Sequence, residues 1–235
     1  MRQHRIPFIP DGTKGVEGMQ ARGERLTALT GVLAVILWIV GLVVINSFSD
    51  KIPHHPTDAQ LLAWVKGNSN SILLGGWLFM VGCVSFLWFA NVVRTRLAAA
   101  EGGSSHYSTL CFAGGIGGAV FGMLINAGDV GAAVDKGSIS AATAGVLHNG
   151  TDVFFVAAEL MMIPFVLGAA IVFLKTRMVP RFWAWFSILV AIVLLIGPIG
   201  WAGLIFGTPI WILGTTFFLL RPERQSQARP APALA

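Results

Sequence analysis

The sequence carries very little charge. Only 11% of its 235 residues are Asp, Glu, Lys or Arg, whereas an average soluble domain has about 25%. Hydrophobic residues make up 55% of the chain. A soluble protein with so few charges could not cover its surface, so this composition argues against an ordinary soluble domain and favours a protein that has lipid as its solvent.

Cysteine is also scarce. The chain has two cysteines, Cys83 and Cys111, and each lies inside an apolar run. Two thiols at different membrane depths are poor partners for a disulfide, which needs closely spaced Cα atoms. We therefore expect no disulfide framework and interpret both cysteines as small core residues.

The signature motifs of several enzyme classes are missing. There is no P-loop, G-x-S-x-G or H-E-x-x-H. The glycine-rich stretch 114–118 lies inside an apolar run and is not a dinucleotide-binding loop. The stretch HHPTD (54–58) lacks the ligand spacing of a zinc site, and His106 and His148 lie at opposite membrane faces, which excludes a haem pair. We expect no metal and no cofactor.

Long apolar runs dominate what is present. A transmembrane helix needs about 20 mostly apolar residues. Six such runs lie at about 26–47, 71–93, 106–128, 150–174, 181–198 and 201–220. The last two are separated by Gly197, Pro198 and Gly200, which break helices. The first run is longer than a signal-peptide core and lacks a cleavage site. The sequence predicts an all-α polytopic bundle of about six transmembrane helices, 26–220.

The basic residues fall on one side of this predicted topology. Thirteen of the sixteen Lys and Arg residues lie in the two terminal segments and the even-numbered loops, and only Lys51, Lys66 and Lys136 lie on the other side. Basic residues stay cytoplasmic, so both termini are expected in the cytoplasm and the protein in the bacterial cytoplasmic membrane. The net charge of +5 then follows from topology. We expect membrane lipid as the partner and no nucleic acid; a homo-oligomer is left open.

Two terminal segments and one loop complete the predicted organisation. Residues 1–25 and 221–235 are polar, basic or Pro/Ala-rich, a composition typical of disorder. In the first external loop, 56–58 resembles a helix start with a side-chain cap. Apolar residues at 61–65 then predict a short amphipathic helix lying along the outer membrane surface.

The fourth run contains the main candidate site. His148, Asp152 and Glu159 share one helical face, and Glu159 lies about 13 Å beyond Gly150 at 1.5 Å per residue, close to mid-membrane. A charge there costs at least about 2.5 kcal/mol, and no Lys or Arg lies at similar depth in any run. Glu159 is therefore either a neutral, hydrogen-bonded structural group or a group that binds and releases a proton or cation. Asp152 has an alternative interpretation as a helix cap, and His148 as a loop residue.

Small residues in the third run indicate close helix packing. Glycines recur there every four residues, at Gly114, Gly118 and Gly122. Such spacing allows two helix backbones to touch. Asn126 follows on the same face, so we expect it to meet Asp152 or His148.

Two further residues belong to the predicted surroundings of Glu159. Pro164 removes the backbone hydrogen bond to the carbonyl of Leu160 and predicts a kink in the fourth helix. Thr208, in the last run, is expected at the depth of Glu159. We take these residues together with the face of His148 and Asp152 as the candidate binding site.

Four segments resemble a group of small actinobacterial multi-pass membrane proteins of unknown function. They are HPTDAQLLAWVKGNSNS (55–71), WFANVVRTRLAAAEG (88–102), VLHNGTDVFF (146–155) and TRMVPRFWAWFSILVAIVLLIGP (176–198). The resemblance extends over about 26–220. It implies an integral membrane protein and brings no activity or catalytic residues.

Three classes of function remain open. The first is a non-enzymatic membrane protein that moves or senses a small solute, proton or lipid through the face of Glu159. The second is a membrane-embedded enzyme acting on lipid, with His148 and Asp152 at the outer leaflet. The third is a structural subunit that docks another helix on its glycine face.

Overall fold

The computed structural model describes residues 26–47, 51, 55–103 and 105–221. The segments expected to be disordered, 1–25 and 221–235, lie outside the described residues except for Arg221. Every regular element in the described part of the chain is helical. The helices are α2 (Thr30–Ser47), α3 (Asp58–Glu101), α4 (His106–Ile125), α5 (Ala127–Val134), α6 (Ala141–Thr176), α7 (Arg181–Leu195), α8 (Gly197–Ala202), the π-helix η1 (Gly203–Gly207) and α9 (Thr208–Leu220).

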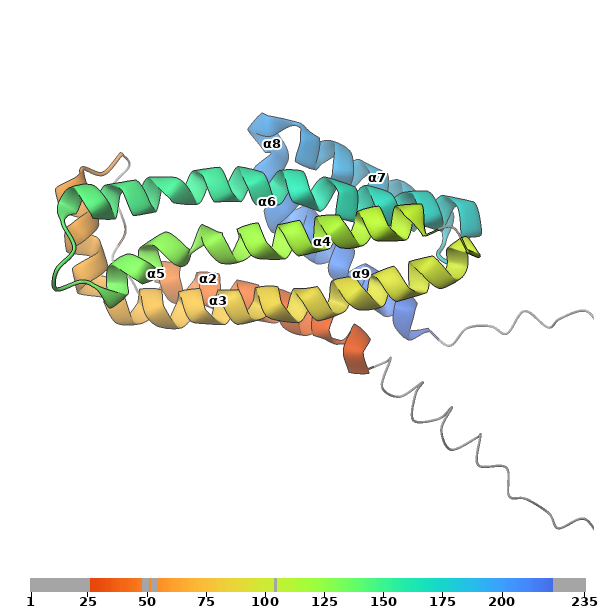
Figure 1. Ribbon diagram of the computed structural model, residues 1–235, viewed down its shortest axis with the longest axis horizontal. Helices are drawn as coiled ribbons and strands as arrows, with labels where there is room; N and C mark the ends of the chain where they lie inside the picture. The colour runs from red at the N-terminus through yellow and green to blue at the C-terminus, as the bar shows by residue number, and fades with distance from the viewer. Residues whose placement is uncertain (1–25, 48–50, 52–54, 104, 222–235) are drawn as a thin grey trace, which may run out of the picture.

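The long helices run side by side in alternating directions (Figure 1). The first and last described helices, α2 and α9, have their outer ends, at Leu26 and Arg221, toward the same end of the bundle. The opposite end is formed by α5 together with the first turns of α3 and α6, and we call it the end cap. The segment α7–α8–η1–α9 turns back before it reaches the end cap, because the chain reverses at 196–200.

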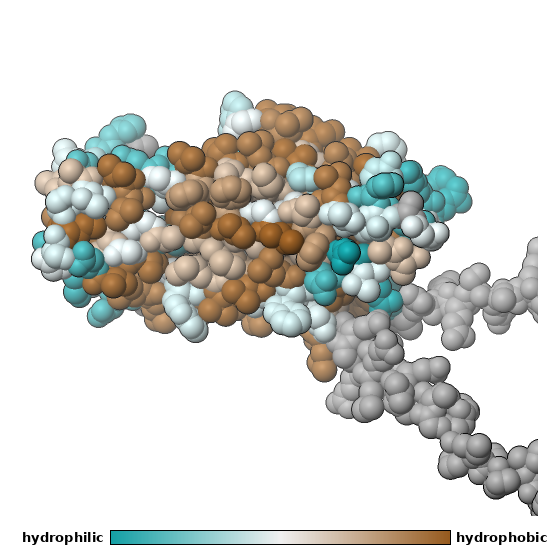
Figure 2. All heavy atoms as spheres, viewed as in Figure 1, coloured by the Kyte–Doolittle hydropathy of each residue, from teal (hydrophilic) through white to brown (hydrophobic). Residues whose placement is uncertain are grey.

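The outer surface of the bundle is apolar around its middle. Many large side chains on it are exposed, among them Ile36, Trp77, Leu160 and Leu189. Figure 2 shows this apolar band with polar residues at both ends. Five helices in the described part are long and apolar enough to cross a membrane, and α7, with 15 residues, is a shorter apolar helix. Such a surface is compatible with a bundle embedded in a membrane.

The amphipathic segment of the first external loop is part of α3. Thr57 caps this helix: its hydroxyl accepts from the backbone N–H of Gln60, whose side chain accepts from the N–H of Thr57. The helix is 44 residues long, about 66 Å, and bends at Asn68, where the side-chain amide donates to the carbonyl of Trp64. The predicted short helix is thus present as the first turns of α3, set off from the rest by the bend at Asn68. Its position along the membrane surface stays a prediction.

Tertiary contacts hold these first turns of α3 in the end cap. Val65 and Ile72 form a small buried cluster with Ala132 and Ala133 of α5. Lys136, just beyond α5, donates from Nζ to the hydroxyl of Ser69 at 2.8 Å. The polar stretch that the sequence marks as a loop is thus part of α3 apart from the bend at Asn68, and the bond from Lys136 ties Ser69 to the end cap.

The fourth predicted span also begins earlier than expected. α6 starts at Ala141, nine residues before 150, and the hydroxyl of Ser140 caps it by accepting from the N–H of Thr143. α6 is 36 residues long, about 54 Å, so it extends beyond a hydrocarbon core of about 30 Å. His148 and Asp152 consequently lie within the helix.

The core lies where α3, α6 and α9 meet. Phe165 stacks edge-on against Phe86 and Trp211, with ring centroids 5.1 and 5.2 Å apart. α4 fits against α6 through Gly114: a Cβ on this glycine would lie 2.5 Å from the backbone N of Phe165 and 2.9 Å from Cγ of Pro164. α6 remains helical through Pro164, and the proline ring occupies the notch that the glycine leaves.

We predict that Gly114→Ala destabilises the bundle. The added methyl group would collide with backbone atoms of α6, which cannot rotate away, and such overpacking costs about 1–3 kcal/mol. Thermal unfolding in detergent measures the effect. Gly131→Ala in α5 is the matched control, because nothing lies within 4 Å of its Cβ. Equal unfolding temperatures for the two variants would contradict the close α4–α6 contact.

Candidate functional site

Glu159 lies in the middle of α6, 18 residues from Ala141 and 17 from Thr176. Its side chain is 5% exposed. The nearest charged residues of α6 are Asp152, about 10 Å toward the end cap, and Lys175, about 24 Å in the other direction, at 1.5 Å per residue. The carboxylate Oε1 is buried and has no hydrogen-bond partner among the described residues. A buried acceptor in this state is unusual and marks the position for a functional explanation.

The segment opposite Glu159 has an interrupted backbone. α7 ends at Leu195, and the next residue, Ile196, has extended dihedral angles (φ −89°, ψ 92°). α8 then runs for six residues with proline in its first turn. Gly200 of α8 faces the carboxylate: a Cβ on it would lie 2.5 Å from Oε1 of Glu159. Glycine is therefore what allows the backbone of α8 to approach the carboxyl group.

The interruption continues past α8 as a π-helix, η1. π-helical turns are rare in proteins, and those that occur are often found at functional sites. Thr208 closes η1, and its hydroxyl donates to the carbonyl of Gly203 at 3.2 Å. Thr208, expected at the depth of Glu159, thus uses its donor on its own helix, and no hydrogen bond to Glu159 is recorded for it.

The surroundings of Glu159 provide no counter-charge. α8, η1 and α9 contain no ionisable residue, and α7 carries only Arg181, at its start. An ionised carboxylate within the hydrocarbon region costs at least about 2.5 kcal/mol. The described residues can therefore hold Glu159 either as a neutral carboxylic acid or with a bound cation that they do not supply.

His148 lies in the end cap, apart from Glu159. Its Nδ1 is 3.0 and 3.2 Å from the two carboxylate oxygens of Asp129 in α5, and its ring meets the edge of Trp64. Asp152, one turn along α6, is exposed. The three residues of the predicted face thus occupy three environments: a half-buried ion pair, a polar surface and a buried interior.

Asn126 occupies the junction between α4 and α5. It does not meet His148, which pairs with Asp129 instead, and its Nδ2 is buried with no hydrogen-bond partner among the described residues. The expected partners were Asp152 or His148, and the amide nitrogen donates to neither of them. α4 ends at Ile125, and Cβ of Asn126 lies 3.7 Å from the position of a Cβ on Gly76 of α3. The pairing of Asp129 with His148 was not indicated by the sequence.

A cavity that the sequence did not indicate lies beside this site. Its volume is about 300 Å³, and α2, α3, α4, α6 and the η1–α9 segment line it. Gly118 and Gly122, two of the predicted packing glycines, form part of its wall. All three glycines of that row thus face helices of this chain: Cβ atoms on them would lie 2.5–3.1 Å from Phe165, Met162 and Cys83.

The described residues thus form a helical bundle, compatible with a membrane protein, that has a buried carboxyl group at a helix interruption. No group of three His, Cys, Asp or Glu residues in the described part of the chain is arranged to hold a metal ion. The chain matches no protein-family model, and the comparisons with curated proteins and with solved structures find no match either.

We predict that Asp129→Asn lowers the unfolding temperature measured in detergent near pH 6. The substitution removes the negative charge opposite His148, at an expected cost of about 1 kcal/mol. Asp152→Asn removes an equal charge from the exposed surface of α6 and should leave the unfolding temperature unchanged. If both variants behave like the wild type, the Asp129–His148 pair does not hold α5 against α6.

Proposed function

We propose that this chain is an integral membrane protein that binds and releases a proton or a small cation at Glu159. The observation that carries the proposal is the buried carboxyl group with an unpartnered oxygen, set against the interrupted segment α8–η1. Ionisable groups at membrane depth are expensive and usually functional. Transport of a small solute or sensing of the membrane potential or pH are the activities to which such a group is suited.

The irregular backbone supports this assignment. Hydrocarbon cannot satisfy free backbone groups, so helix interruptions occur at membrane depth only against protein or a cavity. In transporters, interrupted helices bring backbone dipoles to the ion or substrate. Here Gly200, in the short helix α8, directly faces Glu159, which brings carboxyl group and interruption into one site.

The proposed topology has six spans with both termini in the cytoplasm of a bacterial cell. It is supported by the basic residues: Arg94, Arg96 and Lys175 lie toward the bundle end shared by Leu26 and Arg221, and the end cap has Lys66 and Lys136. α7 with the reversal at 196–200 counts as the fifth span. On its sequence resemblance we further propose kinship with the uncharacterised actinobacterial group.

The other two classes of function have less support. A lipid-acting enzyme would use the His148–Asp129 pair, but Asp152 is exposed and no cluster of metal-binding side chains accompanies the pair in the described residues. A docking subunit would need the row of glycines on α4 to be free, and this row packs against α3 and α6 of the same chain.

We predict a pH-dependent stability that depends on Glu159. Because ionisation of a buried, unpaired carboxyl group costs free energy, the unfolding temperature of the wild type should fall as the pH rises between about 5 and 8. Glu159→Gln keeps the shape of the protonated acid but cannot ionise, so its unfolding temperature should lose this fall. Asp152→Asn is the matched control and should retain it.

Parallel curves for wild type and Glu159→Gln would mean that Glu159 remains neutral throughout and would remove the basis of the proposal. If wild type and Glu159→Gln differ as expected, proton transport is measured next. The purified protein is placed in liposomes that contain a pH-sensitive dye, and the dye reports whether protons cross the liposome membrane. Glu159→Gln should then abolish the signal.

We predict that the end at Arg221 faces the cytoplasm and that residues 135–140 face outward. Alkaline phosphatase becomes active only outside the cytoplasm. Green fluorescent protein exported by the standard route does not fluoresce, so its fluorescence marks the cytoplasmic side. Fusion after Arg221 should therefore give fluorescence, and fusion after Gly137 should give phosphatase activity. The reverse pattern would overturn the orientation drawn from the basic residues.

A further inference from the structure

We propose that the cavity between α2 and the η1–α9 segment holds an acyl chain of a membrane phospholipid. This inference rests on the shape and lining of the cavity and on its opening toward the apolar band. It goes beyond the role given to Glu159 and does not depend on it.

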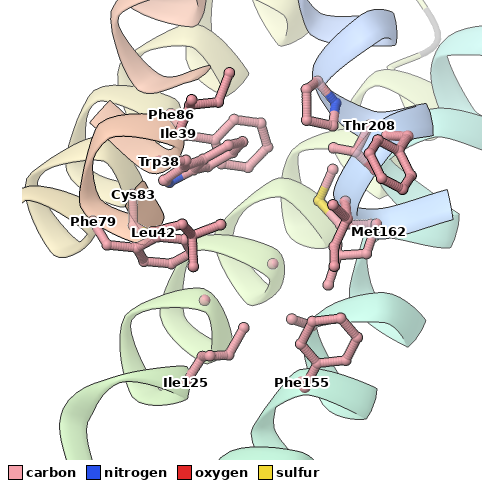
Figure 3. Close-up of a pocket in the computed structure, with 17 residues that line it drawn as sticks. Trp38, Ile39, Leu42, Phe79, Cys83, Phe86, Ile125, Phe155, Met162 and Thr208 are labelled. Atoms are coloured by element: carbon pink, nitrogen blue, oxygen red, sulfur yellow. The ribbon is translucent and has the colours of Figure 1, made fainter. Parts of the chain in front are cut away.

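The cavity arises because α2 and α9 touch near the start of α2, at Gly31, and separate farther along α2. A Cβ on Gly31 of α2 would lie 2.8 Å from Oγ1 of Thr216 and 3.0 Å from Cγ2 of Ile212. Further along α2, Ile39 and Leu42 instead line a space of about 300 Å³. In Figure 3 this space separates Trp38 and Phe86 on one side from Met162 and Thr208 on the other.

The lining offers almost nothing to water. The side chains around the cavity are aliphatic or aromatic apart from the polar atoms of Trp38, Cys83 and Thr208. The hydroxyl of Thr208 donates to Gly203, and the indole nitrogen of Trp38 lies on the side toward α3, 3.0 Å from the position of a Cβ on Gly82. A buried water needs two to four polar partners, and apolar cavities stay dry and take up apolar molecules.

The mouth of the cavity opens on the apolar band. Ile39 and Leu42 on α2 and Ile205 and Phe206 on η1 line the cavity and are also exposed, Ile39 to 54% and Phe206 to 58%. In a membrane these side chains meet lipid, so the molecules that reach the mouth are acyl chains. A chain that enters fills a void and gains the dispersion contacts that the lining would otherwise lack.

On the side of α4, the cavity is lined in part by glycines, which have no side chains to fill it. A Cβ on Gly122 would have one neighbour, Sγ of Cys83 at 3.1 Å, so a longer side chain at this position has to extend into the cavity. On the opposite wall, Ala158 of α6 presents only a methyl group. Gly122→Leu and Ala158→Leu are therefore two independent ways to fill the space where the acyl chain would lie.

The test uses the full chain in phospholipid vesicles that contain a phosphatidylglycerol with a diazirine in the middle of one acyl chain. After illumination, peptide mass spectrometry locates the cross-links. Lipid around the bundle labels exposed side chains, whereas only a chain inside the cavity reaches Met162, which is 2% exposed. We expect labelling of Met162 in the wild type and a severalfold loss of it in Gly122→Leu and in Ala158→Leu.

Ala113→Leu is the matched control, because it adds bulk to the exposed face of α4 away from the cavity, and it should leave the labelling of Met162 unchanged. Labelling of exposed residues should be equal in all variants, which shows that each is folded and inserted. No label on Met162 in the wild type, or undiminished label in a correctly folded filled variant, would overturn the proposal. Glu159 does not line the cavity, so Glu159→Gln should still show labelling of Met162, and this result is separable from the outcome for Glu159.

Discussion

Backbone hydrogen bonding in an apolar solvent is the constraint on which the structure depends. Hydrocarbon offers no partner to a free N–H or C=O group. In the membrane environment that we propose for this chain, its apolar parts therefore have to be helical, and a helix interruption needs protein on the sides where its backbone groups are free. The reversal at 196–200 meets this requirement: its continuation through α8 and η1 lies against α6 and beside the cavity. The same requirement brings the interruption close to Glu159.

Glycine determines how the helices then approach one another. Between helices in lipid there is little hydrophobic driving force, so close backbone contact and dispersion stabilise the packing. Gly114 allows α4 to touch the backbone of α6, and Gly200 allows α8 to approach Glu159. Where a helix diverges from its neighbour, however, a glycine leaves space instead of filling it. Gly122 contributes in this way to the wall of the cavity, so one residue type produces both the tightest contacts and the largest gap.

The sequence indicated the apolar helices, a side-chain cap within 56–58 and the position of Glu159 inside a long apolar helix, because these depend on local composition and on spacing along one helix. Prediction from the sequence failed where contacts between segments far apart in the chain determine the structure. The polar stretch at 66–71 belongs to α3, where Lys136 donates to Ser69 and the flanking Val65 and Ile72 pack in the small end-cap cluster. α6 starts at Ala141, where Ser140 caps a segment with weak apolar signal. The Asp129–His148 pair and the cavity follow from the relative placement of helices, which no spacing in a single sequence specifies.

The two proposed sites share one structural element. Leu204 and Phe206 of η1 line the cavity, and Gly200, only four residues before Leu204, faces Glu159. An acyl chain in the cavity and a proton or cation at Glu159 would therefore act on the same interrupted segment from two sides. Thermodynamic linkage then requires that any effect be reciprocal: if an acyl chain changes the affinity of Glu159 for its ligand, that ligand changes the affinity for the chain by the same factor. An interrupted segment suits such coupling, because its short helices do not belong to one continuous helix that would have to move as a whole.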